Sequence, residues 1–168
     1  MNLGVGLEPD TAIGPLVSEE QQERVLGYIE QGIAEGAAVV CGGDRAFDQG
    51  YFVSPTVFAD VTDDMTIVKE EIFGPVVFVL PFDSIEEVIE RANHSPYGLA
   101  AGVWTENVKT GHYVASKLRA GTVWVNCYNF FDAASPFGGF KQSGLGRELG
   151  SYAFDNYTEV KSVWVNLN

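Results

Sequence analysis

The sequence predicts an α/β fold in which helices cover a parallel-type sheet. Apolar runs of strand length alternate with segments of helical spacing from residue 18 to residue 126. Strands that run parallel need crossovers of about a dozen residues, which this alternation provides. The composition, with 46% hydrophobic and 20% charged residues, is typical of a folded globular protein. The 168 residues are enough to bury a substantial core.

The first predicted helix begins at Ser18. Residues 18–21 have the spacing of a capping box, in which serine and glutamine side chains bind the free amides of a helix start. Val25 and Ile29 then recur at helical spacing on one face. We expect this helix to end near Gly36.

Three apolar runs predict strands in the first half of the chain. Residues 37–41 are expected to form a buried strand that ends in a glycine turn. Pro55 interrupts the run 52–58, which places that strand toward a sheet edge. The continuous run 76–81 is typical of a central strand.

The second half of the chain continues the alternation. Ser84 starts another capping box, and the helix that follows should end before Pro96. Residues 99–104 are expected to form a strand, 107–118 a helix and 122–126 a further strand.

A long loop rich in glycine, serine and phenylalanine follows, over residues 127–150. Loops of this length are usually functional or disordered, and its four phenylalanines favour a packed or ligand-contacting loop. Its stretch GLGRELG lacks the spacing of a dinucleotide-binding motif, so Gly138, Gly139 and Gly144 are interpreted as turn residues. Residues 157–168 alternate like a strand.

The charge and the cysteines exclude several classes of function. A formal charge of −13 repels phosphate backbones and anionic membranes, so neither nucleic acid nor a membrane is expected as a partner. Cys41 and Cys127 have no zinc spacing and are expected to be buried structural residues of a reduced, cytoplasmic protein. His94 and His112 are expected in helix-end and surface positions, and no metal site is predicted.

Glu70 and Glu71 are the strongest candidate site residues. An adjacent pair of glutamates is most often a solvated acidic surface. Here, however, the pair precedes Phe73, Gly74 and Pro75 and a buried run. A carboxylate beside an aromatic ring can accept two hydrogen bonds from a vicinal diol such as ribose, while the ring covers a flat heterocycle.

Two stretches carry a family resemblance. KEEIFGPVV at 69–77 and AGTVWVNCYNFFDAASPFGGFKQSGLGRELG at 120–150 resemble the C-terminal part of the NAD(P)-dependent aldehyde dehydrogenase superfamily. The resemblance extends over nearly the whole chain. It implies a partial catalytic domain at 1–156 and a C-terminal strand at 157–168, through which subunits of a homo-oligomer pair.

The resemblance also implies roles for individual residues. Glu71 would bind the hydroxyls of the nicotinamide ribose, and Phe73 would pack near the nicotinamide. Phe131 and Phe137 would line the aldehyde pocket.

Other implications concern the active site as a whole. Lys141 and Glu148 match positions behind the active site, where they help a proton path or hold structure. The family's nucleophilic cysteine, its glutamate base and its dinucleotide-binding sheet lie upstream of the matched region. No catalytic residue is therefore assigned, and the chain alone is expected to bind NAD or NADP weakly or not at all and to be inactive. The alternative is a stand-alone, non-catalytic oligomerisation or interaction module.

Overall fold

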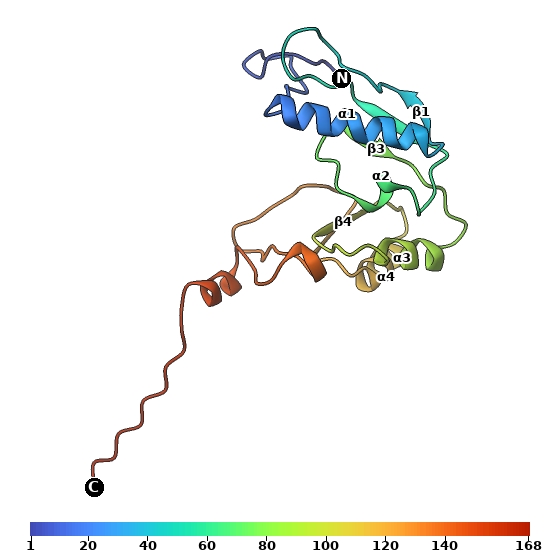
Figure 1. Ribbon diagram of the computed structural model, residues 1–168. Helices are drawn as coiled ribbons and strands as arrows, with labels where there is room; N and C mark the ends of the chain where they lie inside the picture. The colour runs from blue at the N-terminus through green and yellow to red at the C-terminus, as the bar shows by residue number, and fades with distance from the viewer. The chain divides into compact units, whose positions relative to one another are not determined.

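The computed structural model describes residues 1–168 and divides them into two compact units, Met1–Pro81 and Phe82–Asn168. Each unit contains a pair of parallel strands and at least one helix packed nearby, so the predicted α/β class with parallel pairing is confirmed (Figure 1). None of the helices combines the length and the apolar character that a membrane span requires.

The first unit is built on a three-stranded sheet in the order β1-β2-β3. Its strands are β1 (Ala38–Cys41), β2 (Thr56–Ala59) and β3 (Val76–Phe78). β2 and β3 run parallel, whereas β1 pairs with β2 antiparallel and has a register shift between Val39 and Cys41. The sheet is therefore mixed.

Helix α1 (Glu19–Ala34) begins where the capping box predicts. The Ser18 hydroxyl accepts a hydrogen bond from the amide of Gln21 at 3.2 Å, and Gly36 adopts a positive φ of 100° just after the helix end. Both predicted ends are confirmed. A short helix that the sequence patterns did not predict, α2 (Thr66–Lys69), lies in the crossover from β2 to β3.

The core of the first unit lies between α1, α2 and β2. Val25 and Ile29 of α1, Phe58 of β2 and Ile67 of α2 are almost completely buried in one hydrophobic cluster, together with Ile72. The apolar face of α1 that its spacing predicts is the face that packs here.

Three strand predictions in this unit were wrong in detail. Pro55 precedes β2 and does not interrupt it, so β2 keeps its ladder and occupies the centre of the sheet. The run 76–81 forms only the three-residue β3, at an edge of this sheet. β1 is exposed along its whole length, because none of its residues packs in the hydrophobic core of the unit.

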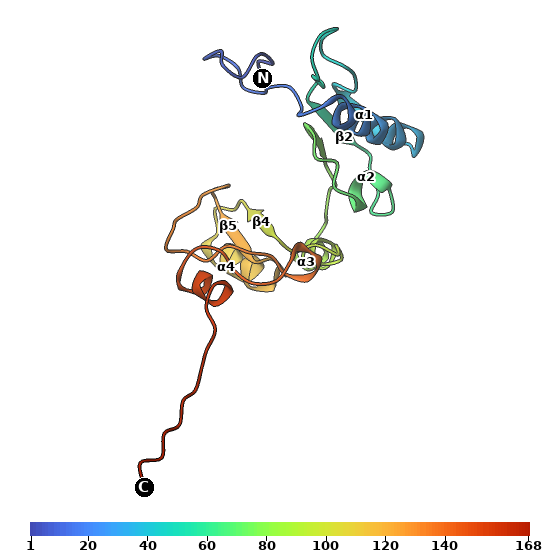
Figure 2. The same ribbon diagram turned by 60° about the vertical axis from the view of Figure 1, so that its left-hand side comes forward.

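The second unit confirms the four elements predicted for residues 84–126. Helix α3 (Ile85–Asn93) follows Ser84, whose hydroxyl accepts from the amide of Glu87. Strands β4 (Ala100–Val103) and β5 (Thr122–Val125) lie side by side in parallel, joined by α4 (Val108–Lys117), as Figure 2 shows. His94 follows the last residue of α3 and His112 lies in α4, as predicted.

The loop after β5 is packed, as expected for its phenylalanines. The indole Nε1 of Trp124 donates to the carbonyl of Phe130 at 2.9 Å, and Phe137 and Glu148 pair as an antiparallel bridge. Two 3₁₀ helices follow, Lys141–Ser143 and Ser151–Asn156. Gly144 has a positive φ of 116°, in agreement with a turn role. Gly138 is required for space instead, because an added Cβ would lie 2.7 Å from the carbonyl oxygen of Gly146.

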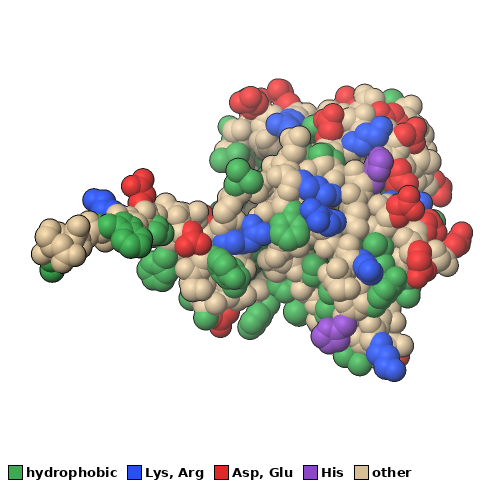
Figure 3. All heavy atoms as spheres, turned by 90° about the horizontal axis from the view of Figure 1, so that it is seen from below, with side chains coloured by type: hydrophobic (Ala, Val, Ile, Leu, Met, Phe, Trp, Pro, Cys, Tyr) green, Lys and Arg blue, Asp and Glu red, His purple; other side chains and the backbone are tan.

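The strand predicted at residues 157–168 does not form within this chain. The segment is extended, without ladder hydrogen bonds, and leaves the rest of its unit (Figure 1). Val160 and Trp164 are fully or nearly fully exposed, at 103% and 93%, and Figure 3 shows hydrophobic side chains along the projecting segment. Alternation alone does not make a strand, since the backbone groups also need a neighbour to pair with.

Candidate functional site

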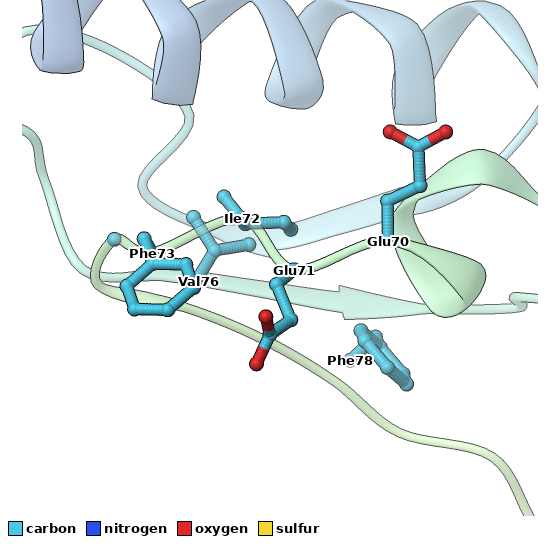
Figure 4. Close-up of a pocket in the computed structure, with 7 residues that line it drawn as sticks. Glu70, Glu71, Ile72, Phe73, Val76 and Phe78 are labelled. Carbon is cyan, nitrogen blue, oxygen red and sulfur yellow. The ribbon is translucent and has the colours of Figure 1, made fainter. Parts of the chain in front are cut away.

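A shallow pocket of about 330 Å³ lies in the first unit, around the segment that joins α2 to β3 (Figure 4). It is lined by Glu70, Glu71, Ile72, Phe73, Gly74, Val76 and Phe78. The pocket thus contains both residues that the sequence singles out for cofactor binding.

Glu71 and Phe73 face this pocket together. In Figure 4 the carboxylate of Glu71 points to the same side of the segment as the rings of Phe73 and Phe78. Both site residues are exposed, with 71% of Phe73 accessible to solvent. A carboxylate with free lone pairs next to an uncovered ring can bind a diol attached to a flat ring system.

The backbone of Phe73 has an unusual conformation that α1 stabilises. Its φ is 53°, in the left-handed region, which is rare for a bulky residue. The side-chain amide of Gln21 donates to the carbonyl of Phe73 at 3.0 Å and to that of Ile72 at 3.4 Å. Gly74 allows the close approach, because a Cβ there would lie 2.6 Å from a methyl group of Val25.

Glu70 points away from its neighbour. The hydroxyl of Tyr28 on α1 donates to Glu70 Oε2 at 2.7 Å, and Figure 4 shows this carboxylate directed toward the helix. The guanidinium of Arg24 lies 5.7 Å from the centre of the Tyr28 ring. The two adjacent carboxylates therefore point to different sides of the segment.

The start of the segment is fixed by Glu35, at the C-terminal end of α1. Its carboxylate accepts from the amide and the hydroxyl of Thr66, the first residue of α2, at 2.7 and 2.6 Å. These bonds and one from Gln31 lower the pKa of Glu35 from its ordinary value, with the Thr66 hydroxyl as the largest cause. The carboxylate supplies the cap that Met65, the residue before α2, cannot supply.

Sequence reasoning did not find Gln21, Tyr28 and Glu35. The available signal was their spacing, because positions seven residues apart lie on nearly the same face of a helix. The apolar positions of α1 and the capping role predicted for the Gln21 side chain already accounted for the pattern. That predicted role was wrong, because the Gln21 side chain binds the carbonyls of Ile72 and Phe73 and not the start of the helix.

The two predicted substrate residues also lie together, in the second unit. The rings of Phe131 and Phe137 meet edge-on with centroids 5.0 Å apart, and Trp124 contacts Phe131 in the same manner at 5.6 Å. Phe131 keeps 47% of its surface exposed. The pair thus offers an apolar surface backed by a tryptophan, and its role in aldehyde binding stays a prediction.

Lys141 and Glu148 have structural contacts. The ammonium of Lys141 donates to the carbonyls of Asn93 and Ser95 at 2.8 and 2.9 Å, at the end of α3. The backbone of Glu148 exchanges two hydrogen bonds with Phe137, each of 2.7 Å. Both residues therefore stabilise the loop that carries the phenylalanines.

The cysteines differ from expectation. Cys41 and Cys127 are free, as predicted, but both are exposed and neither is a buried structural residue. Cys41 lies on the exposed β1, and Cys127 follows β5 at the start of the loop. No group of three or more histidine, cysteine, aspartate or glutamate residues is arranged to hold a metal ion.

The structure thus shows an α/β chain with a carboxylate and an aromatic ring beside a shallow pocket, and comparison with known proteins identifies its family. The model of the aldehyde dehydrogenase family matches residues 1–163. The chain belongs to the aldehyde dehydrogenase family.

Individual relatives agree with the family match. The Bacillus subtilis protein DhaS is 73% identical over 164 residues, which are 98% of this chain and 33% of DhaS. Human mitochondrial aldehyde dehydrogenase is 56% identical over 98% of this chain and 32% of its own length. The chain therefore spans about a third of the length of the curated relatives it matches.

Solved structures show the same fold. The NAD⁺ complex of an aldehyde dehydrogenase from Bacillus cereus matches with a TM-score of 0.96 and 75% identity, over 99% of this chain and 34% of that protein. A mutant of the P. syringae indole-3-acetaldehyde dehydrogenase AldA, in complex with NAD⁺ and IAA, matches with a TM-score of 0.94 and 51% identity, over 98% of this chain and 34% of that protein.

Proposed function

We propose that this chain is the C-terminal part of an NAD(P)-dependent aldehyde dehydrogenase, which oxidises an aldehyde to a carboxylic acid. Residues 1–156 would be part of the catalytic domain and residues 157–168 a strand that pairs with another subunit. The observation that carries the proposal is the pocket that Glu71 and Phe73 share, in a chain whose solved relatives include NAD⁺ complexes.

The proposed cofactor site uses the two residues differently. The bound NAD(P) would accept the hydride that the aldehyde loses. Glu71 would orient the cofactor by accepting hydrogen bonds from the ribose hydroxyls, and Phe73 would lie against the nicotinamide ring. Phe131 and Phe137 would provide the apolar wall for the aldehyde, and neither would touch a transferred proton.

This chain alone should be inactive. Oxidation of an aldehyde through a covalent intermediate needs an activated nucleophile, a base and donors for the oxyanion. We assign none of these roles to residues of this chain; the exposed Cys127 has no histidine or carboxylate partner among the hydrogen bonds described above. The exposed thiols suit a reducing compartment such as the cytoplasm.

Two calorimetric titrations with NAD⁺ test the proposal. The isolated chain should bind too weakly for a micromolar Kd, and a micromolar Kd would contradict the proposal. In the complete enzyme that contains this segment, Glu71→Gln should weaken NAD⁺ binding about tenfold, the effect of losing a charged hydrogen-bond acceptor. Glu20→Gln on the exposed side of α1 is the matched control and should leave the Kd unchanged.

A second candidate is a stand-alone module that binds other subunits without catalysis, and the exposed C-terminal segment supports pairing between subunits under both proposals. Val160, Val163 and Trp164 expose 73% or more of their surface, and an extended apolar segment can add a strand to the edge of another sheet. Light scattering with size exclusion would show concentration-dependent oligomers that are lost when residues 157–168 are removed. A monomer at all concentrations would exclude this role.

A further inference from the structure

We propose that Tyr28 is a positioning residue that holds Glu70 against α1 and so leaves Glu71 as the carboxylate that faces the cofactor pocket. The inference rests on the proposed role of Glu71. It concerns how an adjacent pair of acids is divided between two tasks.

The backbone turns the two side chains to opposite sides. Glu70 has φ −110° and ψ 151°, which is extended geometry, and successive side chains of an extended segment point in opposite directions. Figure 4 shows this result, with the Glu70 carboxylate toward α1 and the Glu71 carboxylate toward the rings of Phe73 and Phe78. Extended geometry alone does not fix the rotamer of a long, exposed glutamate, however.

Tyr28 supplies the missing restraint. Its hydroxyl donates to Glu70 Oε2 at 2.7 Å, between residues 42 positions apart in the chain. Tyr28 is half-buried on α1 and packs against the hydrophobic core, so its hydroxyl has a defined position. Arg24, 5.7 Å from the ring centre, adds positive charge on the same side. These two contacts hold the Glu70 carboxylate on the helix side of the segment.

Release of Glu70 would change the pocket. Because Glu70 already belongs to the lining, a rotation about its side-chain bonds would bring a second carboxylate near Glu71. A second negative charge beside Glu71 would repel a diphosphate-bearing cofactor. We therefore expect the loss of the Tyr28 hydroxyl to weaken cofactor binding through the charge at position 70.

A double-mutant cycle with equilibrium NAD⁺ titrations of the complete enzyme tests this mechanism. Tyr28→Phe should raise the Kd about fivefold, the effect expected from one lost hydrogen bond. The same substitution in a Glu70→Gln background should change the Kd less than twofold, because no charge is released. Tyr113→Phe removes a tyrosine hydroxyl from α4 and is the matched control, which should leave the Kd unchanged.

The outcomes separate this inference from the function on which it rests. An equal effect of Tyr28→Phe in both backgrounds, or no effect in either, would overturn the positioning role. Thermal unfolding of each variant identifies a loss that is only structural, because such a loss would lower the Tm and persist in the Glu70→Gln background. If Glu71→Gln leaves the Kd unchanged, the proposed function itself fails, whatever Tyr28→Phe does.

Discussion

The Glu35 carboxylate at the end of α1 accepts both the amide and the hydroxyl of Thr66, and so joins the end of one helix to the start of another. Residue 66 lies only four positions before Glu70. The contact therefore fixes the origin of the segment that forms the pocket.

The stability of the first unit should depend on pH through Glu35. Hydrogen bonds from Thr66 and Gln31 lower its pKa in the folded chain below the ordinary 4.5. The stabilisation is thus fully present above the ordinary pKa, and it is lost as the pH falls through the lowered folded value. Urea unfolding followed by circular dichroism between pH 3 and pH 7 should show this loss.

Glu35→Gln keeps the shape of the side chain and removes its titration. The difference in unfolding free energy between the original chain and this variant should shrink toward low pH. Asp64, whose pKa is also lowered, keeps its hydrogen bond from the Thr62 hydroxyl in both proteins, so this largest part of its contribution cancels in the difference. If the difference in unfolding free energy stays constant with pH, Glu35 is not the group whose titration changes the stability.

Phe58 should be the most costly position in the core of the first unit. It is completely buried in the centre of the sheet, in the cluster that joins α1, α2 and β2. Phe58→Ala should destabilise the chain by about 3–5 kcal/mol, measured by urea unfolding. The same substitution at Phe154, which is 68% exposed, should cost less than about 0.5 kcal/mol.

Two glycines should respond to alanine in opposite directions. Gly27 lies in the middle of α1 with open space around it, so Gly27→Ala should stabilise the helix by about 0.5–1 kcal/mol. At Gly121 a Cβ would lie 1.6 Å from the backbone oxygen of Gly138, and Gly121→Ala should cost at least about 2 kcal/mol. All three tryptophans belong to the second unit, so their fluorescence reports unfolding at Gly121 directly. If both substitutions stabilise the chain, the close approach of Gly121 to the backbone of Gly138 is contradicted.

Lys141 should contribute to the stability of the second unit. Its ammonium holds the carbonyls of Asn93 and Ser95. Lys141→Met keeps the aliphatic stem of the side chain. It should lower the free energy of unfolding, followed by tryptophan fluorescence, by about 1 kcal/mol. Lys109→Met, on the exposed side of α4, is the control, and an equal effect of the two substitutions would argue against the contact.

Local signals predicted the helices well, because their starts depend on neighbours in sequence. Ser18 and Ser84 cap α1 and α3 through amides three residues later, and such contacts can be read from a single chain. The place of a strand in a sheet depends on distant pairing. The spacing around Pro55 therefore gave the wrong position for β2, and the alternation after residue 156 gave a strand that has no partner within the chain.

The candidate site shows the same division. Glu71 and Phe73 stand out because they lie next to each other in sequence. Gln21 and Tyr28 hold the segment that carries these two residues, but they lie far from it in sequence. Gln21 is 52 positions from Phe73, and Tyr28 is 42 positions from Glu70. Only the folded arrangement brings these groups to the pocket.

The projecting segment after residue 156 has a practical consequence for anyone who handles this protein. An exposed terminal segment whose backbone has no hydrogen-bonded neighbours fits readily into the active site of a protease. Digestion should trim residues 157–168 first and spare the first unit and the remainder of the second unit. Protection of this segment would then be the simplest sign that another polypeptide has covered it.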